Sequence, residues 1–301
     1  DRSVSRGLGD VYKRQLHEGV PTEQILCGNG AADLIFRLVW AKKPRRALVT
    51  APTFAEYATA LESVGCTVER FFLREQEDFA VTDAFCAAIR PGVDMVFLCQ
   101  PNNPTGQLTA LPLVEQILRC CAACGTLLVV DECFLDFLPD HALHTAKGLL
   151  GEGDLVILKA FTKLYGMAGV RLGYALSADT ALLEQMQACG QPWGVSSLAQ
   201  AAGLAALEET AYVEKVRALI AEQRPRLTDG LRALGLRVLD GKANYLLFQA
   251  PETLGETLRQ RGAVLRSCAN YPGLGPGWYR TAVRTGPENE QLLKLLAEVL
   301  E

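Results

Sequence analysis

The stretch LVILKAFTKLYGMAGVRLGY, residues 155–174, decides the fold because its first part repeats a pattern found three times before it. It begins with a short apolar run typical of a buried strand, and similar runs stand at 47–50, 95–99 and 126–130. Between the runs, apolar residues recur at helical spacing, in 31–42, 54–65 and 111–125. Strands that alternate with helices form βαβ units. The sequence therefore predicts an α/β domain whose mostly parallel sheet is covered by helices on both faces.

The C-terminal third carries a different pattern. An Ala-, Leu- and Glu-rich segment at 197–231 predicts one long helix that links two domains. Short apolar runs and two helical segments beyond it predict a smaller α+β unit with antiparallel strands. Because 301 residues suit about two domains, we expect a large domain over 16–205 and a small one over 206–301.

Residues 1–15, DRSVSRGLGDVYKRQ, do not fit this organisation. They are polar and Arg-rich, with neither apolar periodicity nor the apolar stretch of a secretory signal. They resemble translated read-through sequence at the end of a gene model, and an ordinary frayed N-terminal arm is the other interpretation. On either interpretation we expect a non-native or disordered leader, and a fold that begins near Leu16.

Composition excludes several classes of protein. The chain has 30 Lys and Arg against 34 Asp and Glu, a net charge of -4, and no basic block, which argues against nucleic acid or an anionic membrane surface as a partner. No apolar run approaches the roughly 20 residues of a membrane span, so we expect a cytoplasmic protein. Cys121 and Cys124, two of ten cysteines, have zinc-type spacing, but no second pair follows. We expect buried thiols, no metal and no disulfide.

Lys163 and Arg171 are the first candidates for chemistry. Lys163 follows the last of the four predicted strands, and Phe161 and Leu164 are its apolar neighbours in sequence. Apolar surroundings disfavour the charged ammonium, which is how a Schiff-base lysine is activated. Arg171 carries a guanidinium that can bind a phosphate through two hydrogen bonds. Most lysines are solvated surface groups, so this pair indicates a site only together with the ends of other strands.

The other predicted strands also end in polar groups, and ligands of α/β sheets bind beyond the carboxyl ends of the strands. Asn103 lies in the rigid loop PNNPTG, 101–106, directly after one strand, and Asp131 ends the next. A carboxylate at the end of a buried strand is costly unless it is paired. The small residues GNGAA at 28–32 open the first strong helix, where backbone N–H groups can hold an anion. Taken singly, these features also suit an ordinary turn, a helix N-cap and a plain helix start.

In this order along the chain, these features resemble one known family. They match the fold-type I pyridoxal-phosphate enzymes, and residues 16–301 are similar to the class I and II aminotransferases. The resemblance implies an aspartate aminotransferase-like fold, with pyridoxal 5′-phosphate as the cofactor. Such a cofactor needs an amine for its aldehyde, a carboxylate for its pyridine nitrogen and donors for its phosphate.

The resemblance also implies a role for each position. Lys163 and Asp131 would be catalytic: the lysine would form the Schiff base and move protons at the substrate carbon, and the carboxylate would pair with the pyridinium. Asn103 would bind the phenolic oxygen of the cofactor, and Phe54 would stack on its ring. The implied phosphate ligands are Gly30, Ala31, Ala32, Thr162 and Arg171. The implied substrate contacts are Asn103, Arg266, Arg280 and Arg284.

The segment LRSCANYPGLGPGWYRTAVRTGPENEQLL, 265–293, resembles the threonine-phosphate decarboxylase branch, which acts in cobalamin biosynthesis. That branch and the transaminases differ in which substrate bond stands perpendicular to the cofactor ring, so the arginines that fix the carboxylate decide the reaction. The resemblance implies decarboxylation of L-threonine O-3-phosphate to (R)-1-aminopropan-2-ol phosphate. Histidinol-phosphate transamination is the alternative, and for Arg266 and Arg284 surface ion pairing is the alternative role.

The sequence departs from the family pattern in three places. Phe134 stands where most members have a Tyr, and Ala160 stands where they usually have a Ser or Thr that binds the phosphate. One such hydrogen bond is worth about 0.5–1.5 kcal/mol. Members also carry an N-terminal arm and a first helix before the segment that begins at Leu16, so we expect a truncated chain. An inactive fragment and a non-catalytic module of the same fold are further alternatives; the family otherwise implies a homodimer with a small phosphorylated amino acid as substrate.

Overall fold

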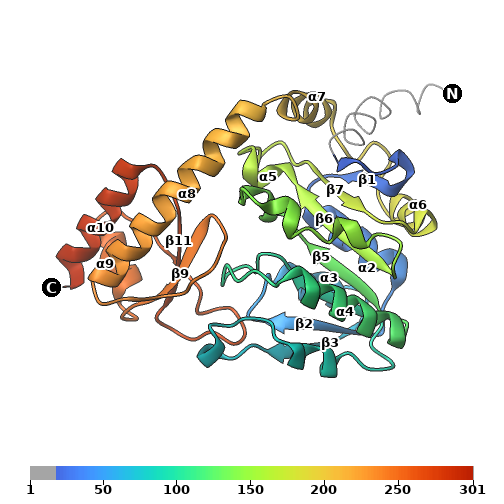
Figure 1. Ribbon diagram of the computed structural model, residues 1–301, viewed down its shortest axis with the longest axis horizontal. Coiled ribbons are helices and arrows are strands. Elements are labelled where there is room, and N and C mark those ends of the chain that lie inside the picture. The colour runs from blue at the N-terminus through green and yellow to red at the C-terminus, as the bar shows by residue number, and fades with distance from the viewer. Residues whose placement is uncertain (1–17, 301) are drawn as a thin grey trace.

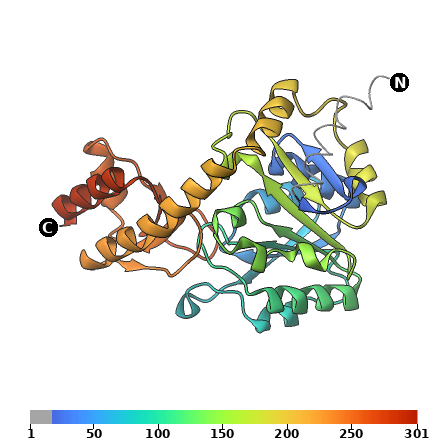
Figure 2. The same ribbon diagram turned by 45° about the horizontal axis from the view of Figure 1, so that its top comes forward.

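The computed structural model describes residues 18–300, so the leader predicted at 1–15 lies outside the described residues. The chain forms a large domain and a smaller C-terminal domain (Figures 1 and 2). The large domain is built on a seven-stranded sheet and the smaller one on a four-stranded sheet. The helix α8 (Thr210–Ala233) runs from the large domain to the outer side of the small one. The predicted α/β fold with a smaller C-terminal α+β domain is confirmed.

The large sheet has the strand order β1-β7-β6-β5-β4-β2-β3. Its strands are β1 (Ile25–Gly28), β2 (Arg46–Ala51), β3 (Thr67–Phe72), β4 (Met95–Cys99), β5 (Leu127–Asp131), β6 (Leu155–Ala160) and β7 (Gly173–Leu176). The five strands from β6 to β3 in this order are parallel, whereas β7 is antiparallel to both β6 and β1. The four predicted strands are β2, β4, β5 and β6. The strands β1, β3 and β7 were not predicted from the sequence: β1 and β7 have only four residues each, and β3 carries the charged pair Glu69 and Arg70 in its middle.

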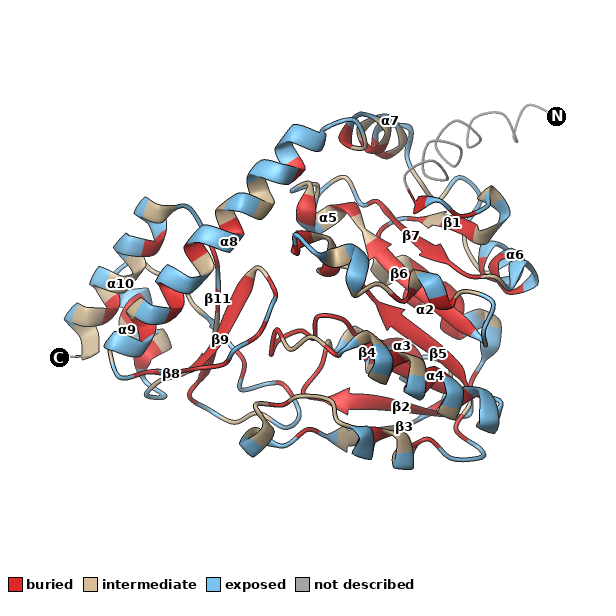
Figure 3. Cartoon of the chain, in the orientation of Figure 1, coloured by how far each residue is buried: buried red, intermediate tan, exposed pale blue. Residues whose placement is uncertain are grey.

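Helices cover both faces of the large sheet because neighbouring residues of a strand point to opposite sides. In β4, Met95 and Phe97 belong to one core and Val96 and Leu98 to the other. The first core is closed by α2 (Ala31–Lys42), α3 (Glu56–Glu62) and α6 (Thr180–Ala188), and the second by α4 (Leu111–Cys124) and α7 (Ser197–Ala206). Figure 3 shows the buried strands between helices whose outer faces are exposed.

Several short helical turns connect these elements. The single-turn helix α5 (Phe161–Leu164) follows β6 without a loop. The 3-10 helices are Thr22–Gln24, Glu75–Glu77, Asp83–Ala88, Leu135–Phe137, His141–Leu143 and Ala146–Leu149.

The small domain is an antiparallel sheet with helices on one face. Its strand order is β10-β11-β9-β8, with β8 (Arg237–Val238), β9 (Tyr245–Gln249), β10 (Arg266–Ser267) and β11 (Trp278–Ala282). α8, α9 (Leu254–Gln260) and α10 (Gly286–Leu300) cover one face around Phe248. On the other face, Leu247 and Trp278 pack against Leu73 and Phe79 of the large domain. The small sheet therefore lies between its own helices and the large domain (Figure 1).

The single helix predicted at 197–231 is wrong in detail: it is two helices, α7 and α8, separated at 207–209. Glu209 leaves the helical region, with ψ of 50°, and precedes the first residue of α8. The acidic pair Glu208 and Glu209 thus lies at a helix N-terminus, where negative charge is favourable. α8 then continues through Pro225 to Ala233.

Further expectations from the sequence concern the cysteines, metal binding and membrane-spanning segments. The ten cysteines all lie within residues 18–300, and none of them forms a disulfide; Cys121 is buried in α4 and Cys124 is half-buried. Within residues 18–300, no group of three His, Cys, Asp or Glu side chains could hold a metal ion. None of the helices in that part of the chain combines the length and the apolar character needed to cross a membrane.

Candidate cofactor and substrate site

A pocket lies at the carboxyl ends of the parallel strands, and twelve residues line it. Eight of them are residues that the sequence predicts for the site: Ala31, Ala32, Phe54, Asn103, Asp131, Thr162, Lys163 and Arg171. The others are Cys99, Cys133, Phe134 and Ala160. Asn103 follows β4, Asp131 ends β5 and Lys163 follows β6. Because β4, β5 and β6 are parallel neighbours, these three side chains meet at one edge of the sheet.

One end of the pocket is built to hold an anion. Gly30 is the N-cap of α2, and its φ of 89° belongs to the left-handed region that favours glycine. A Cβ at this position would lie 2.7 Å from Nη2 of Arg171, so the absence of a side chain lets the guanidinium approach the helix N-terminus. Ala31 and Ala32 begin that helix, where free N–H groups and the helix dipole favour negative charge. Arg171 itself has a φ of 60°, a strained backbone of the kind found at functional positions.

Two donors hold the carboxylate of Asp131. The hydroxyl of Tyr57 donates to Oδ2 at 2.6 Å, and the backbone N–H of Cys133 donates to Oδ1 at 3.0 Å. Tyr57 is fully buried, and burial together with the nearby Asp131 charge raises the pKa of its phenol well above the usual value. The phenol therefore stays protonated and remains a donor.

Tyr57 is a residue that the sequence analysis missed. Its ring stacks on Phe97 with the centroids 4.7 Å apart, and it meets Phe54 edge-on at 5.5 Å. It lies three residues after Phe54 in the same helical pattern, so its ring was counted with the apolar face of that helix. Because the hydroxyl of a buried tyrosine needs a hydrogen-bond partner, a Tyr on that apolar face was the signal available in the sequence.

Lys163 lies in the pocket but is not in the apolar surroundings that its neighbours in sequence suggested. Phe161 and Leu164 are buried and line a different cavity, whereas Lys163 is exposed. The reason is that α5 makes one helical turn, which puts Phe161 and Leu164, three residues apart, on one face and Lys163 on another. The aromatic neighbour of the lysine is Phe134, whose ring centroid lies 5.4 Å from Nζ.

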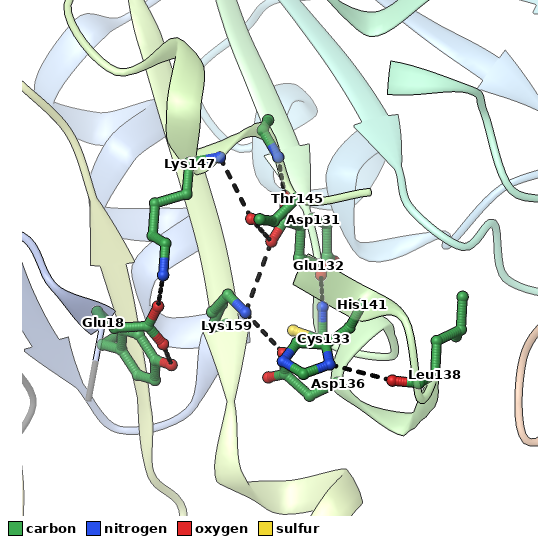
Figure 4. Close-up of polar contacts among 12 residues, drawn as sticks. Glu18, Asp131, Glu132, Cys133, Asp136, Leu138, His141, Thr145, Lys147 and Lys159 are labelled. Atoms are coloured by element: carbon green, nitrogen blue, oxygen red, sulfur yellow. Dashed lines mark hydrogen bonds and ion pairs between the residues drawn. The ribbon is translucent and has the colours of Figure 1, made fainter. Parts of the chain in front are cut away.

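The buried Lys159, on β6, pairs with two carboxylates that follow β5, those of Glu132 and Asp136 (Figure 4). Its Nζ lies 2.7 Å from Oδ1 of Asp136 and 3.6 Å from Oε2 of Glu132, the residue next to Asp131. Glu132 is fully buried, and it also accepts hydrogen bonds from the hydroxyl of Thr145 and the N–H of Ala146. Burial is the largest influence on Glu132 and raises the pKa of its carboxyl, although Lys159 acts in the opposite direction. The ends of β5 and β6 are thus joined by an ion pair that water does not reach.

The three predicted substrate arginines lie in different surroundings. Arg280, on β11, donates from Nη1 to Oδ1 of Asn103, so it reaches the pocket from the small domain. Arg266, its direct partner on β10, donates to Asn270 and lies over the ring of Tyr271, 5.7 Å from its centroid.

Arg284 is not brought to the pocket. Its guanidinium donates to Glu288 at 2.7 Å at the start of α10, and its side chain is largely exposed. This is the surface ion pair that was the alternative reading of the residue.

The residues present fit a pyridoxal 5′-phosphate group. They offer one amine, one carboxylate held by two donors, one amide and one aromatic face, with an anion site at the other end. Oδ1 of Asn103 already accepts from Arg280, so its amide N–H₂ is the donor that it can offer to a ligand. Ala160 lines the pocket and, as predicted, supplies no hydroxyl there.

Comparison with known proteins agrees with this kind of site and with the fold. The model of the family "Aminotransferase class I and II" matches residues 10–299. A threonine-phosphate decarboxylase of Salmonella typhimurium is 39% identical over 288 residues, which are 94% of this chain and 79% of that protein. A histidinol-phosphate aminotransferase of Nitratidesulfovibrio vulgaris is 32% identical over 291 residues, 94% of this chain and 77% of that protein. The solved structure of histidinol-phosphate aminotransferase from Sinorhizobium meliloti, in complex with pyridoxal-5'-phosphate, has the same fold, with a TM-score of 0.86, 22% identity and coverage of 98% of this chain and 82% of that one.

Proposed function

The chain belongs to the class I and II aminotransferase family, and from that premise we propose that it decarboxylates L-threonine O-3-phosphate. The products would be carbon dioxide and (R)-1-aminopropan-2-ol phosphate, a step that we assign to cobalamin biosynthesis. The cofactor is pyridoxal 5′-phosphate, which when bound accepts the electron pair of the bond that breaks at the substrate α-carbon.

The side chains around the pocket bind the cofactor and move protons. Lys163 supplies the amine that binds the cofactor and then delivers or removes a proton at the α-carbon. Asp131 keeps a proton on the pyridine nitrogen, and its own orientation is fixed by Tyr57 and the N–H of Cys133. Arg171 and the first turn of α2 hold the cofactor phosphate.

One observation carries the choice of substrate. Arg266 and Arg280 are direct partners on adjacent antiparallel strands, so both guanidinium groups stand on the same face of the small sheet. One of them, Arg280, already reaches Asn103 in the pocket. Two cations placed side by side suit a substrate with two anionic groups, a carboxylate and a phosphate. Arg280 would hold the carboxylate of such a substrate beside Asn103, and the orientation of that carboxylate decides which bond is aligned for cleavage.

The second candidate is histidinol-phosphate transamination. It is favoured by the similarity to the Nitratidesulfovibrio vulgaris enzyme, which is 32% identical over a comparable part of the chain. The two reactions use the same cofactor residues and differ in the bond that the substrate arginines align.

Two assays on cofactor-loaded protein separate these activities. In the first, L-threonine O-3-phosphate is supplied without any keto acid, and we expect carbon dioxide to be released. In the second, histidinol phosphate is supplied with 2-oxoglutarate, and we expect no glutamate. Turnover in the second mixture alone would refute the decarboxylase assignment. Lys163→Ala is the control for both, because it removes the amine that either reaction needs.

We also propose that the protein acts as a cytoplasmic homodimer. Trp193 and Leu198 are exposed at 71% and 81%, which is unusual for large apolar side chains close together in sequence and is typical of a surface that a partner covers. Light scattering after size-exclusion chromatography tests this: a mass near twice 32.7 kDa supports it, and a mass near 32.7 kDa contradicts it.

A further inference from the structure

Tyr245 is a buried aromatic residue at the start of β9 that the proposed chemistry does not use. Its ring lies between two residues of the site. Cζ of Arg280 lies 5.0 Å from the ring centroid, and the ring of Phe134 meets it edge-on at 5.1 Å. A guanidinium over an aromatic face is attracted by the ring quadrupole, so the position of this ring decides where Arg280 can rest.

The ring is itself fixed to the large domain. The Tyr245 hydroxyl donates to the carbonyl oxygen of Asn102 at 2.8 Å, one residue before Asn103. Burial raises the pKa of this phenol well above its usual value, so it stays protonated and keeps donating. One side chain of the small domain therefore contacts both Arg280 and the loop that carries Asn103.

The anchor at Asn102 is rigid. Its buried side-chain amide donates to the carbonyl of Pro52 and to the hydroxyl of Thr105, and accepts from the hydroxyl of Thr53, each at 2.9 Å. These bonds fasten the loop 101–106 to the segment that leads into Phe54. A hydrogen bond to such an anchor restricts Tyr245 more than a bond to a mobile loop would.

We propose that Tyr245 is a positioning residue that sets the orientation of Arg280 against Asn103, and thereby the orientation in which the site holds a substrate carboxylate. Tyr245 itself does not touch the reacting atoms. The inference rests on the proposed function only in assigning the carboxylate to Arg280. Beyond that function, we infer that selectivity for a carboxylate depends on the Tyr245 ring beside Arg280 and on the hydrogen bond of the Tyr245 hydroxyl to Asn102 in the large domain.

The test measures binding of two phosphates that cannot react because they have no amine. 3-Phosphoglycerate has a carboxylate and a phosphate, and glycerol 3-phosphate has only the phosphate. Dissociation constants come from calorimetric titration into cofactor-loaded protein. We expect the unmutated protein to bind 3-phosphoglycerate more tightly, because only that ligand engages Arg280.

Two variants separate the contribution of the Tyr245 ring to ligand binding from that of its hydroxyl. Tyr245→Leu removes both, and we expect it to weaken 3-phosphoglycerate binding about tenfold while glycerol 3-phosphate binding stays unchanged. Tyr245→Phe keeps the ring and loses the anchor, and we expect about a threefold loss, again for the carboxylate ligand alone. Tyr279→Phe is the matched control: this buried tyrosine, next to Arg280 on β11, donates to the carbonyl of Glu252 and lies in the core beneath α9.

A purely structural role would weaken both ligands alike, so an equal loss overturns the proposal, as does unchanged binding in Tyr245→Leu. An unmutated protein that does not distinguish the two phosphates overturns it too. The result is independent of the decarboxylase assignment. If the protein releases no carbon dioxide but the variants still lose the carboxylate ligand selectively, the proposed function fails and the role of Tyr245 stands.

Discussion

The hydroxyl of Tyr57 lies 2.6 Å from Oδ2 of Asp131, and both side chains are buried. A hydrogen bond to a charged group contributes about 1.5–3 kcal/mol. We expect Tyr57→Phe to lower the free energy of unfolding by that amount. We also expect it to speed release of the cofactor, because the carboxylate would lose its hydrogen bond at Oδ2 and could rotate. Urea unfolding measures the first effect, and loss of cofactor absorbance after dilution measures the second.

Tyr174→Phe is the control for this prediction. Tyr174 is also buried and donates to a buried carboxylate, that of Glu18, but it lies outside the cofactor pocket. We expect it to lose stability while cofactor release keeps its rate. If both variants release the cofactor equally fast, Tyr57 acts through general stability and not through Asp131.

The Lys159 ion pairs predict a large loss of stability. Lys159→Met removes the cation that pairs with Glu132 and Asp136, and Glu132 is fully buried. Breaking a buried pair on one side costs about 3–5 kcal/mol. Urea unfolding of Lys159→Met should show a loss of this size, and Lys159→Arg, which keeps the charge, should show a smaller one.

Lys215→Met, on the exposed side of α8, is the matched control for this substitution. Surface substitutions usually change stability by less than about 0.5 kcal/mol. A loss in Lys159→Met no larger than that of the control would mean that the buried carboxylates find other partners.

Residues at the ends of strands could be predicted from the sequence, because the pattern itself brings them together. Asn103, Asp131 and Lys163 each follow an apolar run, and parallel neighbouring runs end at one edge of a sheet. Arg171 was assigned to the anion site by the chemistry of its guanidinium and by the family resemblance. The alternation of strand and helix patterns predicts a parallel sheet, and a parallel sheet places the residues that follow its strands close together.

Residues that meet only through tertiary packing could not be predicted in this way. Tyr245 touches Asn102 across 143 positions of sequence, and Lys159 meets Asp136 across 23. No periodic pattern contains such pairs, since each depends on how the domains or the loops pack. The same limit explains Lys163, whose apolar neighbours in sequence turned out to face another cavity.

His141 predicts a pH dependence of stability. Burial, followed by the charge of Arg217, lowers the pKa of its imidazole from 6.5. The unfolded chain therefore takes up a proton on this residue at a higher pH than the folded protein does. The contribution of His141 to stability is complete above pH 6.5 and is lost as the pH falls from there toward the folded pKa, with a slope of at most about 1.4 kcal/mol per pH unit.

Urea unfolding between pH 7.5 and 5 measures this slope, and His141→Gln should make it shallower. Ala142→Gln, at an exposed position of the same turn, controls for the added side chain and should keep the original slope. An unchanged slope in His141→Gln would show that other groups set the pH dependence in this range.

Gly241 predicts how closely the two domains must approach. A Cβ at this position would lie 2.7 Å from the carbonyl carbon and oxygen of Gly106, in the loop that carries Asn103. The neighbouring N–H of Lys242 donates to the same carbonyl at 2.6 Å, so this contact cannot widen without losing a hydrogen bond. Because the obstructing atoms belong to the backbone, Gly241→Ala has to push the small domain away from the loop. We expect a loss of about 1–3 kcal/mol, typical of overpacking.

Cofactor binding by Gly241→Ala should weaken as well, since the displaced loop carries Asn103 and receives the hydrogen bond of Tyr245. Gly275→Ala is the control, because a Cβ there meets no atom within 4 Å. Thermal unfolding measures the loss of stability, and titration of the cofactor followed by its fluorescence measures the affinity. A melting temperature and a cofactor affinity in Gly241→Ala equal to those of Gly275→Ala would mean that the approach of Gly241 to Gly106 does not hold the domains together. In that case the packing of Trp278 against Phe79, whose rings meet edge-on at 5.5 Å, would hold the two domains together. The contact between Gly241 and Gly106 would only be a consequence of that packing.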